Sequence, residues 1–349
     1  KFREKETGIA NCNSMHCYRI NHLVGRGAAG DAFLADGPDG ECVLKCVPLA
    51  VASTQQRRRA LKEVQVLRRA RHPNVLGILD TFLHHEHLVV VSEYCNAGDL
   101  QAVVARRRAM VFPVEAGPSS DESIGFSEAA VLGVFAQVAC ALRYIHGQDV
   151  VHRDLKTSNI FLTKRGVVKV GDFGVAAVAS QTLLPTPCPS ASVLTGGDRL
   201  MGSIHHLPPE VCDGGEQTAA GDCWALGVAL YEMCALSLPF DGSNLLVIVL
   251  RILEGAVKPL PPCYSAELRR LCADLLCLNP RKRITAEKVV ASPIVRRVQR
   301  HPDSSIDKIE VPNSKEEAFR LLGDTRPFSR LAEAAEYERF VMRQLALLD

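Results

Sequence analysis

The chain has 349 residues, of which 47% are hydrophobic, and its formal net charge is +2. This length suits about two ordinary domains or one large bilobal domain, and the hydrophobic share is enough for a sizeable core. The balanced charge gives no reason to expect a nucleic acid or an anionic membrane as a partner. Two weakly charged runs, Ala129–Leu142 and Cys223–Phe240, are interpreted as buried helices of a soluble protein, because the first is too short for a membrane span and the second contains Glu232.

The thirteen cysteines are an odd number and include no Cys-x-x-Cys pair. No secretory signal is visible in this sequence. Free thiols in a reducing compartment are therefore expected in preference to a disulfide framework. Most of the thiols are expected to be small buried hydrophobic groups.

The first patterned part of the chain predicts three strands. Residues 17–47 contain three short apolar runs separated by turn residues. The first turn holds the pattern Gly-x-Gly-x-x-Gly at Gly25, Gly27 and Gly30. Because a strand follows this pattern, and not a helix, it lacks the context of a dinucleotide-binding fold. Lys45 lies on the third predicted strand.

A helix and a second pair of strands are predicted next. The helix covers residues 53–70 and contains Glu63. The strands cover Val75–Phe82 and Leu88–Ser92. The histidine-rich segment 84–87 between them has two interpretations, a metal site and a polar turn. The polar turn is favoured, because no Cys or further His stands at ligand spacing.

Two more helices are predicted before residue 150. Asp99 precedes a helix that begins at Leu100, and it suits the N-cap position. Residues 110–126 contain many Pro, Gly and Ser residues and are interpreted as an inserted loop. The apolar segment 127–146 predicts a buried helix that leads into the most informative stretch of the chain.

That stretch covers residues 150–174 and reads V-V-H-R-D-L-K-T-S-N-I-F-L-T-K-R-G-V-V-K-V-G-D-F-G. A loop begins at His152 and runs to Asn159. Two short strands with a turn between them are predicted after it, and Asp172 follows the second strand. A surface turn with incidental polar residues is the alternative interpretation. The agreement in residue type, spacing and predicted context argues against that alternative.

This stretch resembles the catalytic and metal-binding loops of protein kinases, H-R-D-L-x-x-x-N followed by D-F-G. The resemblance covers Tyr18–Val295 and includes Asp222, at the place of the residue that anchors a central buried helix. It implies an α+β, bilobal fold with a small β-rich N-lobe containing one main helix and a larger, mostly helical C-lobe. It divides the chain into an N-terminal extension (1–16), an N-lobe (17–92), a hinge and C-lobe (93–300) and a helical C-terminal tail (301–349).

The resemblance also implies a chemistry, the transfer of a phosphoryl group from ATP with Mg²⁺ as the metal. Asp154 is implied to be the catalytic base that accepts the proton of a substrate hydroxyl. Lys156 is implied to contact the γ-phosphate as a point charge. Asn159 and Asp172 are implied to bind Mg²⁺, which prefers hard oxygen ligands.

The glycine pattern and the strand lysine complete the implied nucleotide site. Lys45 is implied to hold the α- and β-phosphates and to pair with Glu63. Asp99 is implied to reach the ribose, although its role as an N-cap explains it equally well. The implied ATP-binding residues are Gly25, Gly27, Gly30, Ala32, Val43, Lys45, Ser92, Glu93, Cys95, Asp99 and Phe161.

The implied activation segment covers residues 172–210, and its end resembles the element that closes this segment in peptide-binding kinases. Ser203 keeps the hydroxyl expected near the catalytic aspartate. Residues 204–206, Ile-His-His, replace a more usual Pro-x-Tyr, so the substrate-docking surface differs from the family pattern. Glu210 is implied to form a buried ion pair with Arg283.

Two further motifs, S-N-I-F-L-T-K-x-G-x-V-K-x-G-D-F-G and E-Y-C-x-x-G-D-L, resemble the NIMA-related serine/threonine kinases. Lys156, two residues after the implied catalytic aspartate, resembles the lysine of serine/threonine kinases. Relatives commonly carry an activating Ser or Thr three residues before the closing glycine, where this chain has Arg199. We hypothesise that activation uses either the charge of Asp198 towards Arg153 or phosphorylation of Thr195. Stoichiometric phosphate on Thr195 in active protein, detected by mass spectrometry, together with loss of activity in Thr195→Ala, would decide for the second.

Two other functions are weighed against a protein kinase. A pseudokinase scaffold would show degraded motifs, whereas the implied lysine, base and metal ligands are all present. A small-molecule phosphotransferase would not need the peptide-docking element at 202–210. The expected partners are therefore ATP and protein substrates with Ser or Thr acceptors, without nucleic acid or membrane. The resemblance implies a cytoplasmic protein, with the centrosome or flagellar base as a cytoskeletal address.

Residues 301–349 fall outside the resemblance. A capping box at 314–317 begins one predicted helix. A second predicted helix follows Pro327. Packing on the catalytic domain is one interpretation of this tail, and association with a partner or a second copy is the alternative. The apolar stripe of the second helix consists of Leu331, Ala334, Tyr337, Val341 and Leu348.

Overall fold

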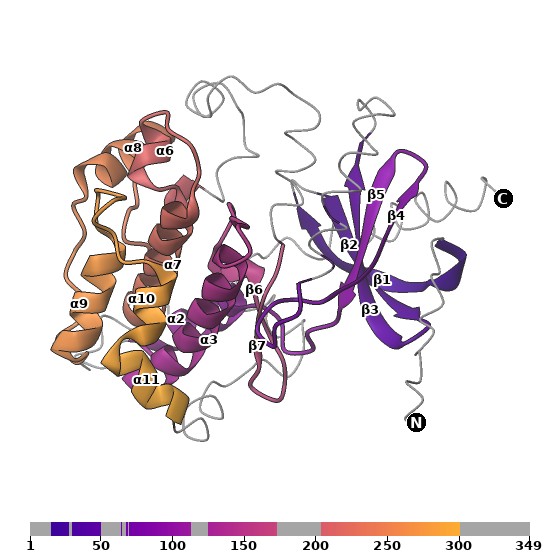
Figure 1. The fold of residues 1–349 in the computed structure, drawn as a ribbon, viewed down its shortest axis with the longest axis horizontal. Coiled ribbons are helices and arrows are strands. Elements are labelled where there is room, and N and C mark those ends of the chain that lie inside the picture. Colours follow the sequence, from indigo (N-terminus) through magenta and orange to yellow (C-terminus); the bar gives the residue numbers. More distant parts are fainter. Residues whose placement is uncertain are drawn as a thin grey trace, which may run out of the picture. The chain divides into compact units, whose positions relative to one another are not determined.

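The computed structural model describes residues 15–27, 30–49, 64, 68, 70–112, 125–172 and 204–300. The chain separates into two compact units (Figure 1). Within the described residues, the first unit contains those up to residue 70 together with 77–94. The second unit contains 71–76 and the described residues from Cys95 onwards.

The first unit is built on a five-stranded antiparallel sheet in the order β1-β2-β3-β5-β4 (Figure 1). The three strands predicted within residues 17–47 are confirmed, and a short 3₁₀ helix, η1 (Met15–Cys17), precedes them. One face of the sheet packs a core of Ala35, Cys42, Leu44, Phe82, Val89 and Val91. The strands are β1 (Arg19–Gly27), β2 (Gly30–Gly37), β3 (Gly40–Pro48), β4 (Ile78–His84) and β5 (His87–Glu93).

The predicted strand Val75–Phe82 is wrong at its beginning. The strand starts at Ile78, and residues 71–76 belong to the second unit. The Leu76 backbone N–H donates to the Val170 carbonyl at 2.8 Å, and the Val170 N–H donates to the Asn74 carbonyl at 2.8 Å. This segment therefore pairs along a strand of the second unit. The predicted helix 53–70, apart from Val64, Arg68 and Ala70, lies outside the described residues together with Glu63.

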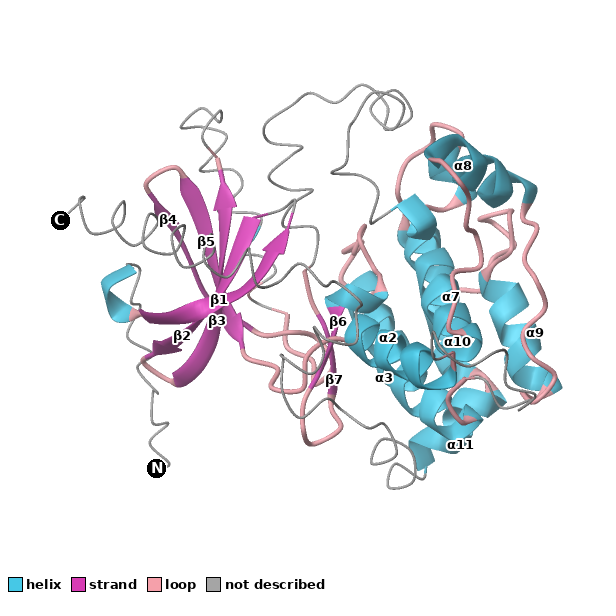
Figure 2. Ribbon diagram, turned by 180° about the vertical axis from the view of Figure 1, so that it is seen from behind, coloured by secondary structure: helices cyan, strands magenta, loops and turns pink. Residues whose placement is uncertain are grey.

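The second unit is mainly helical and carries one small hairpin (Figure 2). Asp99 caps α2 and Ser127 caps α3 through their side-chain oxygens. The hairpin strands are β6 (Ile160–Leu162) and β7 (Val168–Val170), and the 3₁₀ helices are η2 (Thr157–Asn159) and η3 (Ile204–His206). The α-helices are α2 (Leu100–Val111), α3 (Glu128–His146), α6 (Pro209–Cys212), α7 (Ala219–Ala235), α8 (Leu245–Glu254), α9 (Ala266–Leu275), α10 (Ala286–Ala291) and α11 (Pro293–Arg300).

Helices α3 and α7 pack together and form the core of this unit, as the two weakly charged runs predict. Helix α7 ends earlier than its apolar run, because Leu236 adopts a left-handed backbone with φ of 53°. Leu236 and Phe240 nevertheless stay buried. Among the described helices, α3 alone has the length and composition of a membrane span, and 67% of its 18-residue apolar window is buried inside the protein.

The cysteines follow the prediction of free thiols at ten described positions, five of them buried. Cys17 is the exception, because it is disulfide-bonded. The prediction is therefore wrong for this residue, which belongs to the short helix before β1. Burial raises the pKa of Cys42 to about 11 and that of Cys272 to about 12, so these thiols remain protonated at neutral pH.

Candidate active site

The loop that begins at His152 is fixed by the ring of that histidine. The Asp154 backbone N–H donates to Nδ1 of His152 at 3.3 Å, so Nε2 carries the proton and donates to the Gly171 carbonyl at 2.9 Å. Burial lowers the pKa of His152, which keeps the ring neutral. One buried imidazole thus links the loop to the residue before Asp172.

Asp222, in the first turn of α7, holds the same loop from the other side. Its fully buried carboxylate accepts the backbone N–H groups of His152 at 2.7 Å and Arg153 at 2.9 Å. It also lies 2.9 Å from Nε2 of His146 on α3. Arg153 has a φ of 70°, which a non-glycine residue adopts only when its surroundings impose it. The two carboxylate contacts supply that constraint.

Asp154 lies at the centre of a compact polar group. The Lys156 Nζ donates to both carboxylate oxygens, at 3.1 and 2.8 Å. The Asn159 Nδ2 donates to the Asp154 carbonyl at 2.7 Å and to its Oδ2 at 3.1 Å. The Asp154 side chain is 37% exposed, so the carboxylate is oriented by its neighbours and still open to a reactant.

The orientation of the Asn159 amide tests the implied metal site. Because both contacts to Asp154 use Nδ2, the Oδ1 atom is the acceptor that this buried side chain can offer to another group. Asp172, with a φ of 60°, offers carboxylate oxygens just beyond β7. An amide oxygen and a carboxylate are the hard donors that Mg²⁺ prefers. The residues present therefore fit the implied metal.

Gly171 lies in a narrow space and was not among the predicted site residues. Its N–H donates to the Asn159 carbonyl at 3.0 Å. A Cβ atom at this position would lie 2.6 Å from Cδ2 of Leu76 and 2.9 Å from Cε2 of Phe161. Only glycine fits without displacement, so the backbone between β7 and Asp172 passes directly against these side chains.

In the first unit, the sheet register brings the predicted nucleotide residues into adjacent pairs. Ala32 on β2 lies opposite Lys45 on β3, and Val43 lies opposite Ser92 on β5. The three predicted glycines, Gly25, Gly27 and Gly30, lie where β1 turns into β2. Glu93 is the last residue of β5. Gly30 has a φ of 124°, and a Cβ there would overlap the Cys46 carbonyl.

Three further predicted residues lie in the second unit, where the chain after β5 runs beside β6. Asp99 and Phe161 form an isolated antiparallel bridge. Cys95, four residues before Asp99, is buried. The Asp99 Oδ1 accepts the Ala102 N–H at 2.9 Å. The N-cap interpretation of Asp99 is therefore the one observed.

Asp99→Ala is expected to reduce the free energy of unfolding by about 1 kcal/mol, because the first turn of α2 loses its side-chain acceptor. Asp99→Asn keeps an acceptor oxygen at the same place and is expected to stay near the wild-type value. Urea unfolding followed by circular dichroism measures both. Equal losses in the two variants would contradict the capping role.

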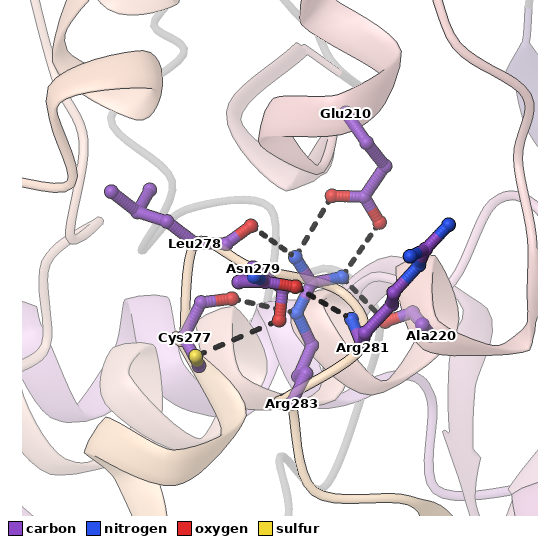
Figure 3. A network of polar contacts seen from close by, with 7 residues as sticks. All are labelled: Glu210, Ala220, Cys277, Leu278, Asn279, Arg281 and Arg283. Atoms are coloured by element: carbon purple, nitrogen blue, oxygen red, sulfur yellow. Dashed lines mark hydrogen bonds and ion pairs between the residues drawn. The ribbon is translucent and has the colours of Figure 1, made fainter.

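Arg283 and Glu210 form the buried ion pair that the resemblance implies (Figure 3). The guanidinium donates to the two Glu210 oxygens at 2.7 and 2.8 Å. The Trp224 ring centroid lies 5.1 Å from Cζ of Arg283, and that ring stacks on Phe240. The other three N–H groups of Arg283 donate to the backbone carbonyls of Cys277, Ala220 and Leu278.

Comparison with known proteins identifies the family to which a chain with this site belongs. The family model described as the protein kinase domain matches residues 18–295, which is most of the chain. The chain belongs to the protein kinase family. The match covers both described units, and it includes the loop around Asp154 and the Glu210–Arg283 pair.

Named relatives of this kinase domain are NIMA-related kinases. It is 33% identical to serine/threonine-protein kinase Nek5 of Homo sapiens, over 80% of this chain and 37% of the relative. It is 33% identical to Nek1 of Mus musculus, over 79% of this chain and 21% of the relative. With Nek3 of Mus musculus it is 29% identical over 86% of this chain and 56% of the relative. The chain thus spans about a fifth to just over half of the length of these relatives.

The kinase domain also contains a buried polar cluster that sequence reasoning missed. Glu232 on α7 accepts the Thr157 hydroxyl at 3.0 Å. Nε2 of His206 on η3 lies 4.0 Å from the same carboxylate. Burial lowers the pKa of His206 to about 3, with Lys156 as a second cause. The sequence indicates this cluster only through Glu232, a charged residue inside an apolar helix. Its partners could not be predicted, because they lie far away in the sequence.

Stability of the kinase domain is expected to depend on pH through Glu232. Burial raises the pKa of this carboxyl from its ordinary 4.5 to about 7. Between these values the unfolded chain loses the proton and the folded chain keeps it, so this group makes stability fall as pH rises. Above pH 7, the free energy of unfolding of Glu232→Gln is therefore expected to exceed that of wild type by roughly 3 kcal/mol at most.

The advantage of Glu232→Gln is expected to disappear below about pH 4.5, where the glutamate is protonated in both states. Thermal unfolding of both proteins across this pH range measures the difference. A difference that stays constant with pH would contradict the raised pKa.

Four predicted site residues lie outside the described residues. Glu63 is the implied partner of Lys45, and the other three belong to the implied activation segment. These residues stay predictions from the sequence: Glu63, Thr195, Asp198 and Ser203.

Proposed function

We propose that this chain is a serine/threonine protein kinase that transfers the γ-phosphoryl group of Mg-ATP to hydroxyl groups of protein substrates. The observation that carries the proposal is the arrangement around Asp154. Its carboxylate is oriented by Lys156 and Asn159 and remains partly exposed. The NIMA-related relatives are named serine/threonine-protein kinases, which supports the serine/threonine class.

In this function, Asp154 orients the acceptor hydroxyl and takes up its proton. Its contact with Lys156 Nζ keeps both carboxylate oxygens in place and puts a positive charge beside them. Asn159 and Asp172 would hold the metal through their oxygens. Bound Mg-ATP supplies the phosphoryl group, and its metal neutralises phosphate charge. Lys45 would hold the α- and β-phosphates, with Glu63 as its partner.

A pseudokinase scaffold is the second candidate, and no observation favours it. Loss of the strand lysine, the base or the metal ligands would be the expected sign of such a protein. Lys45, Asp154, Asn159 and Asp172 are all present. The ordered hydrogen bonds of the loop from His152 to Asn159 are also those of a site prepared for chemistry.

The test is transfer of labelled phosphate from ATP, with Mg²⁺, to casein and to the protein itself. Wild type is expected to label serine or threonine in the acceptor, identified by phosphoamino-acid analysis. Asp154→Asn, measured in parallel, is expected to abolish most of the signal. Folded protein that binds ATP and yet transfers no phosphate, even after phosphorylation by an upstream kinase, would support the scaffold instead.

A further inference from the structure

Helix α8 presents an apolar stripe to solvent. Ile248 and Ile252 face the interior and are buried. On the outer side, Leu246, Leu250 and Leu253 are 56%, 48% and 37% exposed, and their spacing of four and three residues places them on one face. We call these three residues the α8 leucine face.

A fourth exposed leucine lies at the end of α8. Leu278 is 41% exposed, and its Cδ2 would lie 2.9 Å from a Cβ at Gly255, the residue that caps α8. Of the seven exposed large hydrophobic residues in the described part of the chain, four belong to this one region. Single exposed leucines are normal, whereas four in one region form a candidate interaction surface.

The size of the surface limits what can cover it. The exposed parts of four leucine side chains amount to no more than a few hundred Å². A standard stable interface buries about 800 Å² on each partner. A second copy of the chain held by this surface alone would therefore bind weakly. A short amphipathic helix with apolar residues at positions i, i+3, i+4 and i+7 fits the surface better.

The chain itself contains a segment with a similar spacing, in which Ala334, Tyr337 and Val341 stand at positions i, i+3 and i+7. The helix predicted after Pro327 carries an apolar stripe that includes Leu331, Tyr337 and Val341. The 27 residues 301–327 separate it from the end of α11, and in extended form they reach up to about 90 Å. A tethered segment acts at an effective concentration in the millimolar range, which compensates for a small contact area.

We propose that residues 328–348 form an amphipathic helix whose apolar stripe packs on the α8 leucine face of the same molecule. Helix α8 packs against η3 and α6, so the bound tail would lie beside residues 204–212, next to the end of the activation segment. The proposal concerns the tail and is independent of whether the domain transfers phosphate.

Hydrogen exchange of the full chain, followed by mass spectrometry, tests this contact. In wild type the amides of residues 331–348 are expected to exchange more slowly than in Leu250→Glu, by about tenfold. Met110→Glu is the matched control, because Met110 on α2 is also 48% exposed. It is expected to leave exchange in the tail unchanged.

The reciprocal variant Val341→Glu changes only the tail and keeps the test valid if Leu250→Glu folds poorly. It is expected to speed exchange in residues 246–254. Protection is also expected to persist on twentyfold dilution, since the contact is intramolecular. A tail that exchanges equally fast in wild type and Leu250→Glu overturns the proposal. Protection that is lost on dilution assigns the surface to a second copy and overturns it as well.

Discussion

Asp154→Asn is expected to lower the rate constant for phosphoryl transfer by about 10²–10⁴-fold, the range for removal of a positioned general base. The amide keeps the size of the carboxylate and one oxygen for the contacts with Lys156 and Asn159. It cannot take up a proton from an acceptor hydroxyl. The loss is therefore expected in kcat, whereas KM for ATP and the unfolding midpoint stay close to wild type.

Asp149→Asn is the matched control for this substitution. Asp149 lies in the turn between α3 and the catalytic loop, is exposed and has a φ of 55°, which asparagine tolerates well. Its activity is expected to equal that of wild type. Single-turnover kinetics with a peptide acceptor measures both variants. A decrease of less than tenfold in Asp154→Asn would mean that neither the charge of Asp154 nor its proton uptake accounts for the activity, which would then depend on positioning of the reactants.

Arg283→Ala is expected to cost about 3–5 kcal/mol of folding stability, because it leaves the mostly buried carboxylate of Glu210 without its cation. The Arg283 side chain is fully buried and donates five hydrogen bonds, two to Glu210 and three to backbone carbonyls. Single domains are typically stable by about 5–15 kcal/mol. This one substitution therefore removes a large part of the total, and the midpoint of urea unfolding is expected to fall strongly.

Arg297→Ala provides the contrast for Arg283→Ala. Arg297 pairs with Glu267, but the two side chains are 63% and 55% exposed. An exposed pair contributes about 0–1 kcal/mol, because water already solvates both charges. A similar loss in the two variants would show that the burial of Arg283 does not matter. Arg283→Lys is expected to resemble Arg283→Ala more than wild type, since an ammonium cannot reproduce the planar set of donors.

The arrangement of the loop around Asp154 could be predicted from the sequence because its residues are close together in the chain. Asp154, Lys156 and Asn159 fall within six positions, and the structure joins them by direct hydrogen bonds. Local rules also predicted the cap of α2, where the Asp99 side chain reaches a backbone group three residues away. The antiparallel order of the first three strands follows equally from short turns between them.

What could not be predicted depends on partners distant in sequence. Val75 has the residue type of a strand, but its neighbours pair with β7, almost a hundred residues later. The apolar run of α7 continues to Phe240, and nothing in hydrophobicity marks the left-handed turn at Leu236. The cluster of Thr157 with Glu232 likewise forms only when α7 lies against the loop. In each case tertiary contacts override the local signal.

The contact between Asp222 and the loop has a consequence for synthesis on the ribosome. Asp222 follows Asp172 by fifty residues, which takes the ribosome about 3–10 s at usual speeds. Throughout that interval the N–H groups of His152 and Arg153 lack their carboxylate acceptor. A nascent chain that stops before α7 thus contains every motif of the loop around Asp154 but lacks these two hydrogen bonds. The loop is completed only when a later segment leaves the exit tunnel.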